Sequence, residues 1–110
     1  MGKINIAITG CMGRMGQQLI KSAIKDKSTK LVALTENRSI NKKIIGIRPE
    51  LNTEKALGKA NVIIDFTIPK CTFEVLKIAS KLKKKVVIGT TGFTEKEENL
   101  IKKFSKKIPI

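Results

Sequence analysis

The amino-acid sequence predicts an α/β fold in one domain of 110 residues. Short, continuously apolar segments alternate with amphipathic segments of helical periodicity, which is typical of a parallel sheet with helices on both faces. The first apolar segment also runs directly into three glycines, Gly10, Gly13 and Gly16, spaced by three residues. Together these features predict a doubly wound, Rossmann-like sheet that binds a dinucleotide beyond the carboxyl ends of its strands.

The first strand is expected at about residues 3–9 and the first helix at about 13–27. Gly10 can make the tight turn, Gly13 lets a pyrophosphate approach backbone N–H groups, and Gly16 lets the helix lie close to its strand. The pattern is G-x-x-G-x-x-G, whereas G-x-G-x-x-G is commoner. An apolar stripe at helical spacing is expected to face the core: Met15, Leu19, Ile20, Ala23 and Ile24.

A second strand is expected at about 30–35, and Glu36 follows it, twenty residues beyond Gly16. An acidic side chain at this place in a Rossmann-like unit accepts hydrogen bonds from the ribose hydroxyls of the adenosine. The alternative is an ordinary surface carboxylate after a strand.

Residues 37–60 have a weak pattern, with a short strand expected near 44–48 and a helical turn at 53–59. The apolar run 62–66 predicts a buried strand. Pro69 suits the first turn of a helix that continues to about residue 83 and carries four apolar side chains. Those side chains are Phe73, Leu76, Ala79 and Leu82.

Another strand is expected at 86–88, and residues 108–110 resemble the start of a further strand. Thr94 and Glu97 form a capping box that opens a helix through about residue 106. The inward-facing residues of this helix are expected to be Leu100, Ile101 and Phe104. Because the strands are parallel, four loops should meet at one edge: 10–16, 36–38, 66–69 and 89–92.

The composition argues against two classes of partner, nucleic acids and membranes. The 23 Lys and Arg residues exceed the 9 acidic ones, giving a net charge of +14, but the cations are dispersed and Trp and Tyr are absent. These features argue against a nucleic-acid partner. Apolar runs are too short to span a bilayer, and no signal peptide is recognised, so no membrane partner is expected. Two cysteines make no disulfide framework and favour a reducing, cytoplasmic location; no metal site is predicted.

Three sequence blocks in order resemble the 4-hydroxy-tetrahydrodipicolinate reductase family of lysine and diaminopimelate synthesis. They are the glycine block ending in G-R-M-G at 13–16, the D-F-T-I-P block at 65–69, and V-I-G-T-T-G at 87–92, with Glu36 between the first two. The resemblance spans nearly the whole chain. It implies a hydride-transferring oxidoreductase that uses NADH or NADPH.

The resemblance also implies site residues. The pyrophosphate would be held by residues of the glycine loop, namely Gly10, Cys11, Met12, Gly13, Arg14 and Met15. Glu36 would hold the adenosine ribose. The nicotinamide end, beside the substrate, would lie against Gly89, Thr90 and Thr91. The threonine hydroxyls and backbone N–H groups there can orient the carboxamide.

Two departures from the family pattern matter. The family often has an arginine directly after the ribose-binding acid, where it pairs with a 2′-phosphate; here Asn37 stands there and Arg38 follows. We therefore expect NADH to bind at least as well as NADPH, unless Arg38 or Arg14 takes the phosphate. The second departure is that the family's substrate and oligomerisation domain is missing, and the chain has no histidine.

The expected function is accordingly the cofactor-binding half of this reductase, truncated before the second domain and without catalytic residues of its own. The cyclic dicarboxylate substrate and the homo-oligomer, a tetramer in the family, belong to the intact enzyme. Two alternatives remain open: a free-standing module that binds or senses a dinucleotide, and a basic domain that binds nucleic acid.

Overall fold

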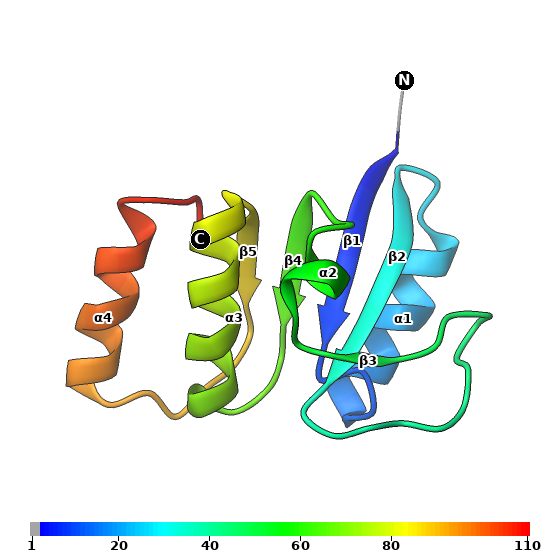
Figure 1. The fold of residues 1–110 in the computed structure, drawn as a ribbon, viewed down its shortest axis with the longest axis horizontal. Coiled ribbons are helices and arrows are strands. Elements are labelled where there is room, and N and C mark those ends of the chain that lie inside the picture. Colours follow the sequence, from blue (N-terminus) through cyan, green and yellow to red (C-terminus); the bar gives the residue numbers. More distant parts are fainter. Residues whose placement is uncertain (1–2) are drawn as a thin grey trace.

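The computed structural model describes residues 3–110, which form a five-stranded, wholly parallel sheet in the order β3-β2-β1-β4-β5. The strands are β1 (Ile4–Thr9), β2 (Thr29–Glu36), β3 (Glu50–Leu51), β4 (Val62–Asp65) and β5 (Lys85–Ile88). The helices are α1 (Arg14–Lys25), α2 (Glu54–Leu57), α3 (Pro69–Leu82) and α4 (Glu95–Ser105). The predicted doubly wound α/β architecture is confirmed (Figure 1).

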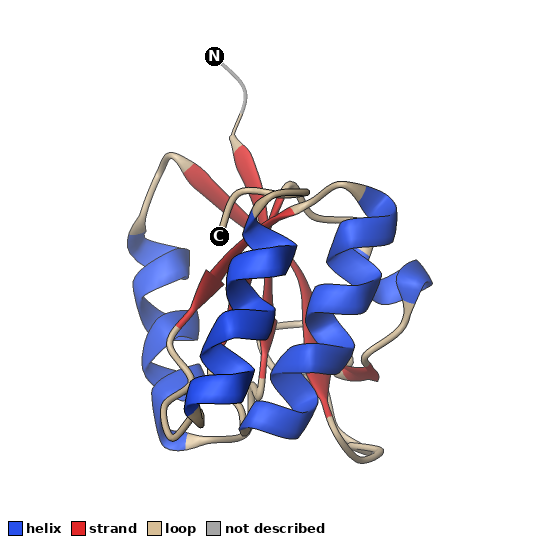
Figure 2. Cartoon of the chain, turned by 90° about the vertical axis from the view of Figure 1, so that its left-hand side faces the viewer, coloured by secondary structure: helices blue, strands red, loops and turns tan. Residues whose placement is uncertain are grey.

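The two faces of the sheet are covered by different elements (Figure 2). Helix α1 packs Ile20 against Ile8 and Leu34 on one face, whereas α2, α3 and α4 pack on the other face around Ile63 and Val86. On the α1 face, helix α1 and the segment between β2 and β3 both lie over the β3 half of the sheet. The β5 end of that face is therefore uncovered, and Val87 is 52% exposed there. The prediction that helices cover both faces is thus only partly correct.

Two predicted core stripes are only partly correct. On α1 only Gly16 and Ile20 are buried, whereas Met15 and Ile24 are about half exposed. These two residues lie in the first and last turns, and the helix contacts the sheet mainly through its middle. On α4, Leu100 is 41% exposed because this helix stands beyond α3 at the end of the molecule (Figure 1) and packs through one side.

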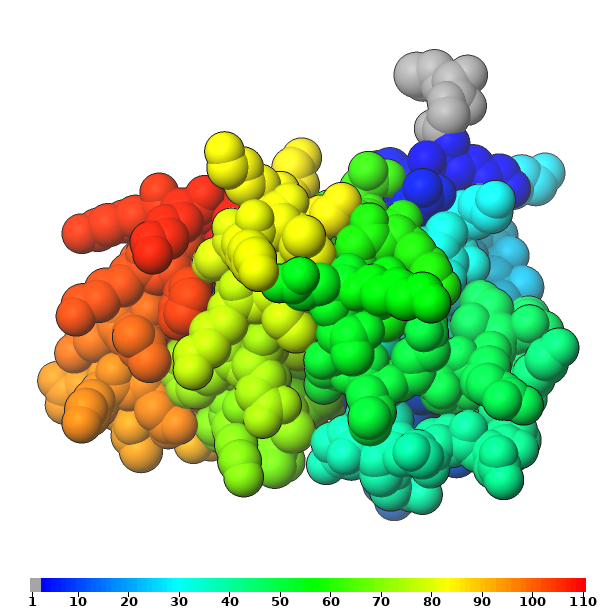
Figure 3. All heavy atoms as spheres, viewed as in Figure 1, coloured from blue at the N-terminus to red at the C-terminus, as the bar shows by residue number. Residues whose placement is uncertain are grey.

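The weakly patterned segment differs most from the prediction. The strand expected near 44–48 is wrong: Ile44 and Ile47 form an isolated antiparallel bridge around a tight turn at Ile45 and Gly46, both with positive φ. The short strand β3 follows instead. The predicted helical turn is confirmed as α2, capped by the Thr53 side chain. In Figure 3 this green segment forms part of the surface at the end of the molecule opposite α4.

The last three residues do not form the expected strand, although they lie beside β5. Ile108 is buried in the core, and the Pro109 carbonyl accepts a hydrogen bond of 3.0 Å from the Val86 amide. Proline cannot donate to the sheet in return, so the pairing stops at one bond. Among residues 3–110, no helix combines the length and apolarity that a membrane span needs.

Candidate functional site

The carboxyl ends of the four longer strands point to the same edge of the sheet, the lower edge in Figure 1. All four loops that the sequence singled out therefore lie at this edge. Its two sides differ, and we describe them as the glycine-loop side (residues 10–16 with Glu36) and the β4–β5 side.

Gly10 and Gly16 have the turn and close-packing roles that the sequence predicted. Gly10 has a φ of +66°, and a Cβ there would lie 2.4 Å from the Phe66 carbonyl oxygen. A Cβ on Gly16 would lie 2.2 Å from the Gly10 carbonyl oxygen, so glycine lets α1 start against its strand. Gly13 has an ordinary φ of −73°, and the one atom near its missing Cβ is the Gly10 carbonyl oxygen at 3.3 Å.

The first turn of α1 has free hydrogen-bond donors. The Cys11 amide donates to the Thr35 carbonyl and the Gly13 amide to the Gly10 carbonyl. The next three amides, of Arg14, Met15 and Gly16, have no acceptor within residues 3–110, and this turn has no acidic residue or side-chain cap. A helix start of this kind attracts an anion through its N–H groups and its dipole.

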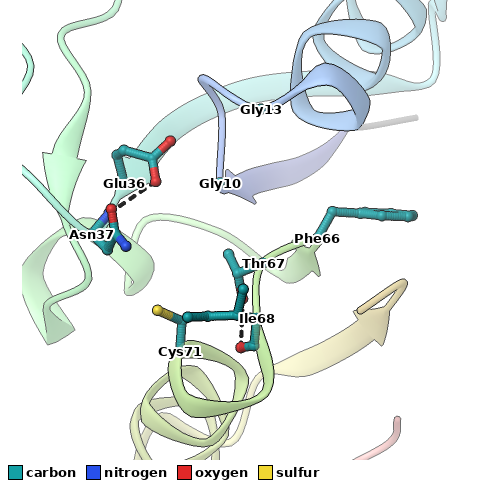
Figure 4. A pocket seen from close by; sticks show the side chains of 8 residues that line it. All are labelled: Gly10, Gly13, Glu36, Asn37, Phe66, Thr67, Ile68 and Cys71. Atoms are coloured by element: carbon teal, nitrogen blue, oxygen red, sulfur yellow. Dashed lines mark hydrogen bonds between the residues drawn. The ribbon is translucent and has the colours of Figure 1, made fainter. Parts of the chain in front are cut away.

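Glu36 is fixed by two bonds from backbone amides, one of them from the glycine loop. Its Oε2 accepts from the Met12 amide at 3.0 Å. Its Oε1 accepts from the amide of the next residue, Asn37, at 3.0 Å (Figure 4). A carboxylate has about four acceptor positions. The two bonds therefore fix the carboxylate and leave acceptor positions open to a ligand hydroxyl.

A hollow of about 260 Å³ lies between the glycine loop and the start of α3 (Figure 4). Four predicted site residues line it, Gly10, Gly13, Glu36 and Asn37. Sequence reasoning did not assign the other four to a site: Phe66, Thr67, Ile68 and Cys71. For Phe66, Thr67 and Ile68, the position directly after β4 at the same edge was the available signal, because parallel strands bring such loops together. Cys71 lies within α3 and had no such signal.

A second hollow of about 420 Å³ shares four of these lining residues, Glu36, Asn37, Ile68 and Cys71, and extends along the side of α3. The two hollows thus form one groove at the sheet edge. Within residues 3–110, no group of three or more potential metal ligands comes together. The two adjoining hollows give the groove the length that an elongated organic ligand needs.

The remaining residues of the glycine-loop side lie around the groove. Met12 and Arg38 line a separate hollow of about 280 Å³ together with Lys42. The side chains of Arg14 and Met15 are exposed and line no hollow described here. Their contribution to a ligand site would come through their free amides.

Both cysteines are buried thiols. Burial, followed by the nearby Glu36 carboxylate, raises the pKa of Cys11 to about 11. Burial also raises the pKa of Cys71, with smaller contributions from Glu74 and Asp65. A raised pKa keeps a thiol protonated at neutral pH, so neither side chain is an activated nucleophile.

The β4–β5 side is built around one carboxylate. Asp65 is fully buried at the end of β4. Its Oδ1 accepts from Thr9 at 2.5 Å and Thr67 at 2.9 Å, and its Oδ2 accepts from Thr72 and, at 3.0 Å, from Thr90. We call these five residues the Asp65 cluster. Asp65 is thus a structural hydrogen-bond acceptor at the end of β4.

This cluster changes the interpretation of the β5 loop. The Thr90 side chain is buried, and its hydroxyl donates to Asp65 while accepting from the Thr67 amide at 2.9 Å. The sequence suggested that the hydroxyls of both threonines face a ligand. The Thr90 hydroxyl is instead bonded within the Asp65 cluster and does not face one. Thr91 is exposed, and none of Gly89, Thr90 and Thr91 lines the 260 Å³ hollow.

Comparisons with known proteins agree with this geometry. Residues 4–110 match the family described as "Dihydrodipicolinate reductase, N-terminus". The chain is 68% identical over its full length to a 4-hydroxy-tetrahydrodipicolinate reductase of Pelagibacter ubique, of which it covers 43%. It is 42% identical to the enzyme of that name from Buchnera aphidicola of Schizaphis graminum, over 96% of this chain and 42% of the relative.

Among solved structures, a dipicolinate-bound dihydrodipicolinate reductase from Paenisporosarcina is 26% identical and superposes with a TM-score of 0.76, covering 94% of this chain and 43% of that one. A D-galactose-1-dehydrogenase from Rhizobium etli shares the fold, at 23% identity and a TM-score of 0.76. The chain thus spans less than half the length of the curated relatives it matches.

Proposed function

The chain belongs to the family of dihydrodipicolinate reductase N-terminal domains, and we propose that it binds a nicotinamide dinucleotide for such a reductase. The reaction proposed for the whole enzyme is the reduction of 4-hydroxy-tetrahydrodipicolinate, by hydride transfer, in cytoplasmic lysine and diaminopimelate synthesis. One observation supports the binding role above the others. The free amides at the start of α1 lie at the same sheet edge as the fixed carboxylate of Glu36.

The residues present fit a dinucleotide. The amides of Arg14, Met15 and Gly16 would bind the pyrophosphate, since these donors have no acceptor of their own. Gly13 has no side chain to intervene between them and the ligand. Glu36 would accept hydrogen bonds from the adenosine ribose with the acceptor positions that its two backbone bonds leave open.

The choice of cofactor rests on Glu36, Asn37 and Arg38. The Glu36 carboxylate favours free ribose hydroxyls and repels a 2′-phosphate, and Asn37 supplies no compensating charge. Arg38, with Lys42 beside the same hollow, acts in the opposite direction. We propose that NADH binds at least as tightly as NADPH.

When bound, the dihydronicotinamide supplies a hydride. This chain's own contribution is to hold the dinucleotide and to present the loop of Gly89, Thr90 and Thr91 at the same edge. Its net charge of +14 attracts both an anionic cofactor and a cyclic dicarboxylate. The chain contains no histidine to donate a proton. We therefore propose that these 110 residues bind the cofactor without turnover.

Calorimetric titration of the 110-residue chain with NADH and NADPH at physiological salt tests the proposal. We expect one saturable site for each ligand, with NADH at least as tight. If neither ligand bound, the binding role would be rejected. Steady NADH oxidation in the presence of the substrate would show instead that these residues include catalytic groups.

A further inference from the structure

We propose that Asp65 is a positioning residue that sets the backbone of the Gly89–Thr91 loop for the nicotinamide end of the cofactor. The inference rests on the proposed function and assigns a part in it to Asp65, which would not itself touch the ligand. It starts from the four threonine hydroxyls, from four different segments of the chain, that converge on this one buried carboxylate.

The hydrogen bonds of Asp65 leave it no free acceptor position. Each carboxylate oxygen accepts from two hydroxyls, Oδ1 from Thr9 and Thr67 and Oδ2 from Thr72 and Thr90. Two oxygens offer about four acceptor positions in total. Asp65 is fully buried and lines none of the hollows at this edge. It is therefore placed to hold other groups and not to exchange a proton with a substrate.

The cluster joins the groove to the β5 loop. Thr67 lines the 260 Å³ hollow, donates its hydroxyl to Asp65 and donates its amide to the Thr90 hydroxyl. Thr90 in turn donates to Asp65. A displacement of Thr90 would leave the Thr67 amide without its acceptor, so the two loops are coupled through one hydroxyl.

The neighbouring residue is fixed as well. The Gly89 amide donates to the Asp65 carbonyl at 2.8 Å, and a Cβ on Gly89 would lie 1.9 Å from the Phe66 ring. Gly89 and Thr90 are thus held from the β4 side by backbone, ring and hydroxyl contacts. Thr91, the next residue, is exposed and remains available to a ligand.

Thr35 offers a matched control. It is paired in register with Thr9 across β1 and β2 and is also fully buried, but its hydroxyl has no hydrogen-bond partner among residues 3–110. Replacing Thr35 with valine, which has nearly the same size and shape, removes a buried hydroxyl without breaking a side-chain hydrogen bond.

The experiment compares NADH with ADP-ribose, which lacks the nicotinamide, on wild type and on Thr90→Val, Thr90→Ser, Asp65→Asn and Thr35→Val. Denaturant unfolding identifies the variants that fold. We expect Thr90→Val and Asp65→Asn to bind ADP-ribose as wild type does, but to lose about fivefold in NADH affinity, the size of one net hydrogen bond. Thr90→Ser, which keeps the hydroxyl, and Thr35→Val should match wild type.

Equal losses for NADH and ADP-ribose, or unchanged NADH binding by a folded Thr90→Val, would overturn the positioning role while leaving the proposed function intact. If Asp65→Asn does not fold, Thr90→Val and Thr90→Ser decide alone. A wild-type chain that binds neither ligand would reject the proposed function, and the inference with it.

Discussion

The two sides of the sheet edge use their hydrogen-bonding groups in opposite ways. On the glycine-loop side, three amides at the start of α1 have no acceptor in the part of the chain that the structure describes, and Glu36 keeps acceptor positions open. On the β4–β5 side, Asp65 and its threonines bond to one another. Unpaired donors can gain a bond from a ligand, whereas a completed cluster can only fix geometry. We therefore propose that the first side supplies affinity and the second supplies alignment.

The largest expected effect concerns the thiol beneath the glycine loop. Cys11 has its pKa raised to about 11, so above pH 9 an unfolded chain would ionise this thiol while the folded chain would not. The unfolded state is then favoured, and the free energy of unfolding should fall by about 2 kcal/mol between pH 9 and 11. Cys11→Ala should lose this part of the pH dependence.

Denaturant titrations of wild type and Cys11→Ala from pH 8 to 11 measure the difference in the pH dependence of the unfolding free energy. Identical pH slopes for wild type and Cys11→Ala would show that burial of the Cys11 thiol has no such effect.

The next effect compares a bonded with an unbonded threonine. Thr9→Val removes a donor from Asp65 and leaves that carboxylate oxygen one bond short, so we expect a loss of about 1–3 kcal/mol in unfolding free energy. Thr35→Val, at the paired position, should be neutral or slightly stabilising because its hydroxyl bonds nothing. Equal costs for both variants, measured by urea unfolding, would contradict the assigned difference.

Gly13→Val tests the glycine-loop side directly. The branched side chain would occupy the space where the pyrophosphate is proposed to lie, and the φ of −73° permits it. We expect at least about a tenfold loss in NADH affinity, or 1.4 kcal/mol. Lys96→Val, in the exposed first turn of α4, is the control and should bind as wild type does. A folded Gly13→Val chain with unchanged affinity would remove the loop from the site.

The smallest effect concerns cofactor choice. Arg38→Ala should lower the affinity for NADPH by about threefold and leave the affinity for NADH nearly unchanged. The effect is small because one exposed charge near the 2′-phosphate contributes little to binding in salt. Titrating both cofactors gives the ratio. If the affinity for NADH fell as much as the affinity for NADPH, Arg38 would instead contact a part that the two ligands share.

Much of this arrangement could be predicted from the sequence because local signals agreed with the fold. Three spaced glycines, an acid after the second strand, Pro69 at a helix start and the Thr94 capping box each specify a local geometry. Signals failed where tertiary packing decides. The largely apolar stretch 44–48 (Ile-Ile-Gly-Ile-Arg) predicts a strand, but Ile45 and Gly46 have positive φ and make a turn there.

The Asp65 cluster could not be predicted in full. Thr67 and Thr72 follow Asp65 within seven residues, but Thr9 and Thr90 are 56 and 25 residues away, and nothing local shows that their hydroxyls reach the same carboxylate. The strand end placed Asp65 at the edge, but only the fold shows that Thr90 turns inward. For the same reason, Cys71 emerged as a groove residue only when α3 was seen beside Glu36 and Asn37.

The central claim is that the free amides of α1 bind the anionic part of a dinucleotide. Amide NMR spectra of the ¹⁵N-labelled 110-residue chain, recorded during titration with NADH, test it most directly. The amide signals of Arg14, Met15 and Gly16 should show the largest saturable shifts, followed by those of Gly89, Thr90 and Thr91. No saturable shift in the first turn of α1, or shifts confined to the opposite edge around Lys83, Lys84 and Lys85, would contradict the claim.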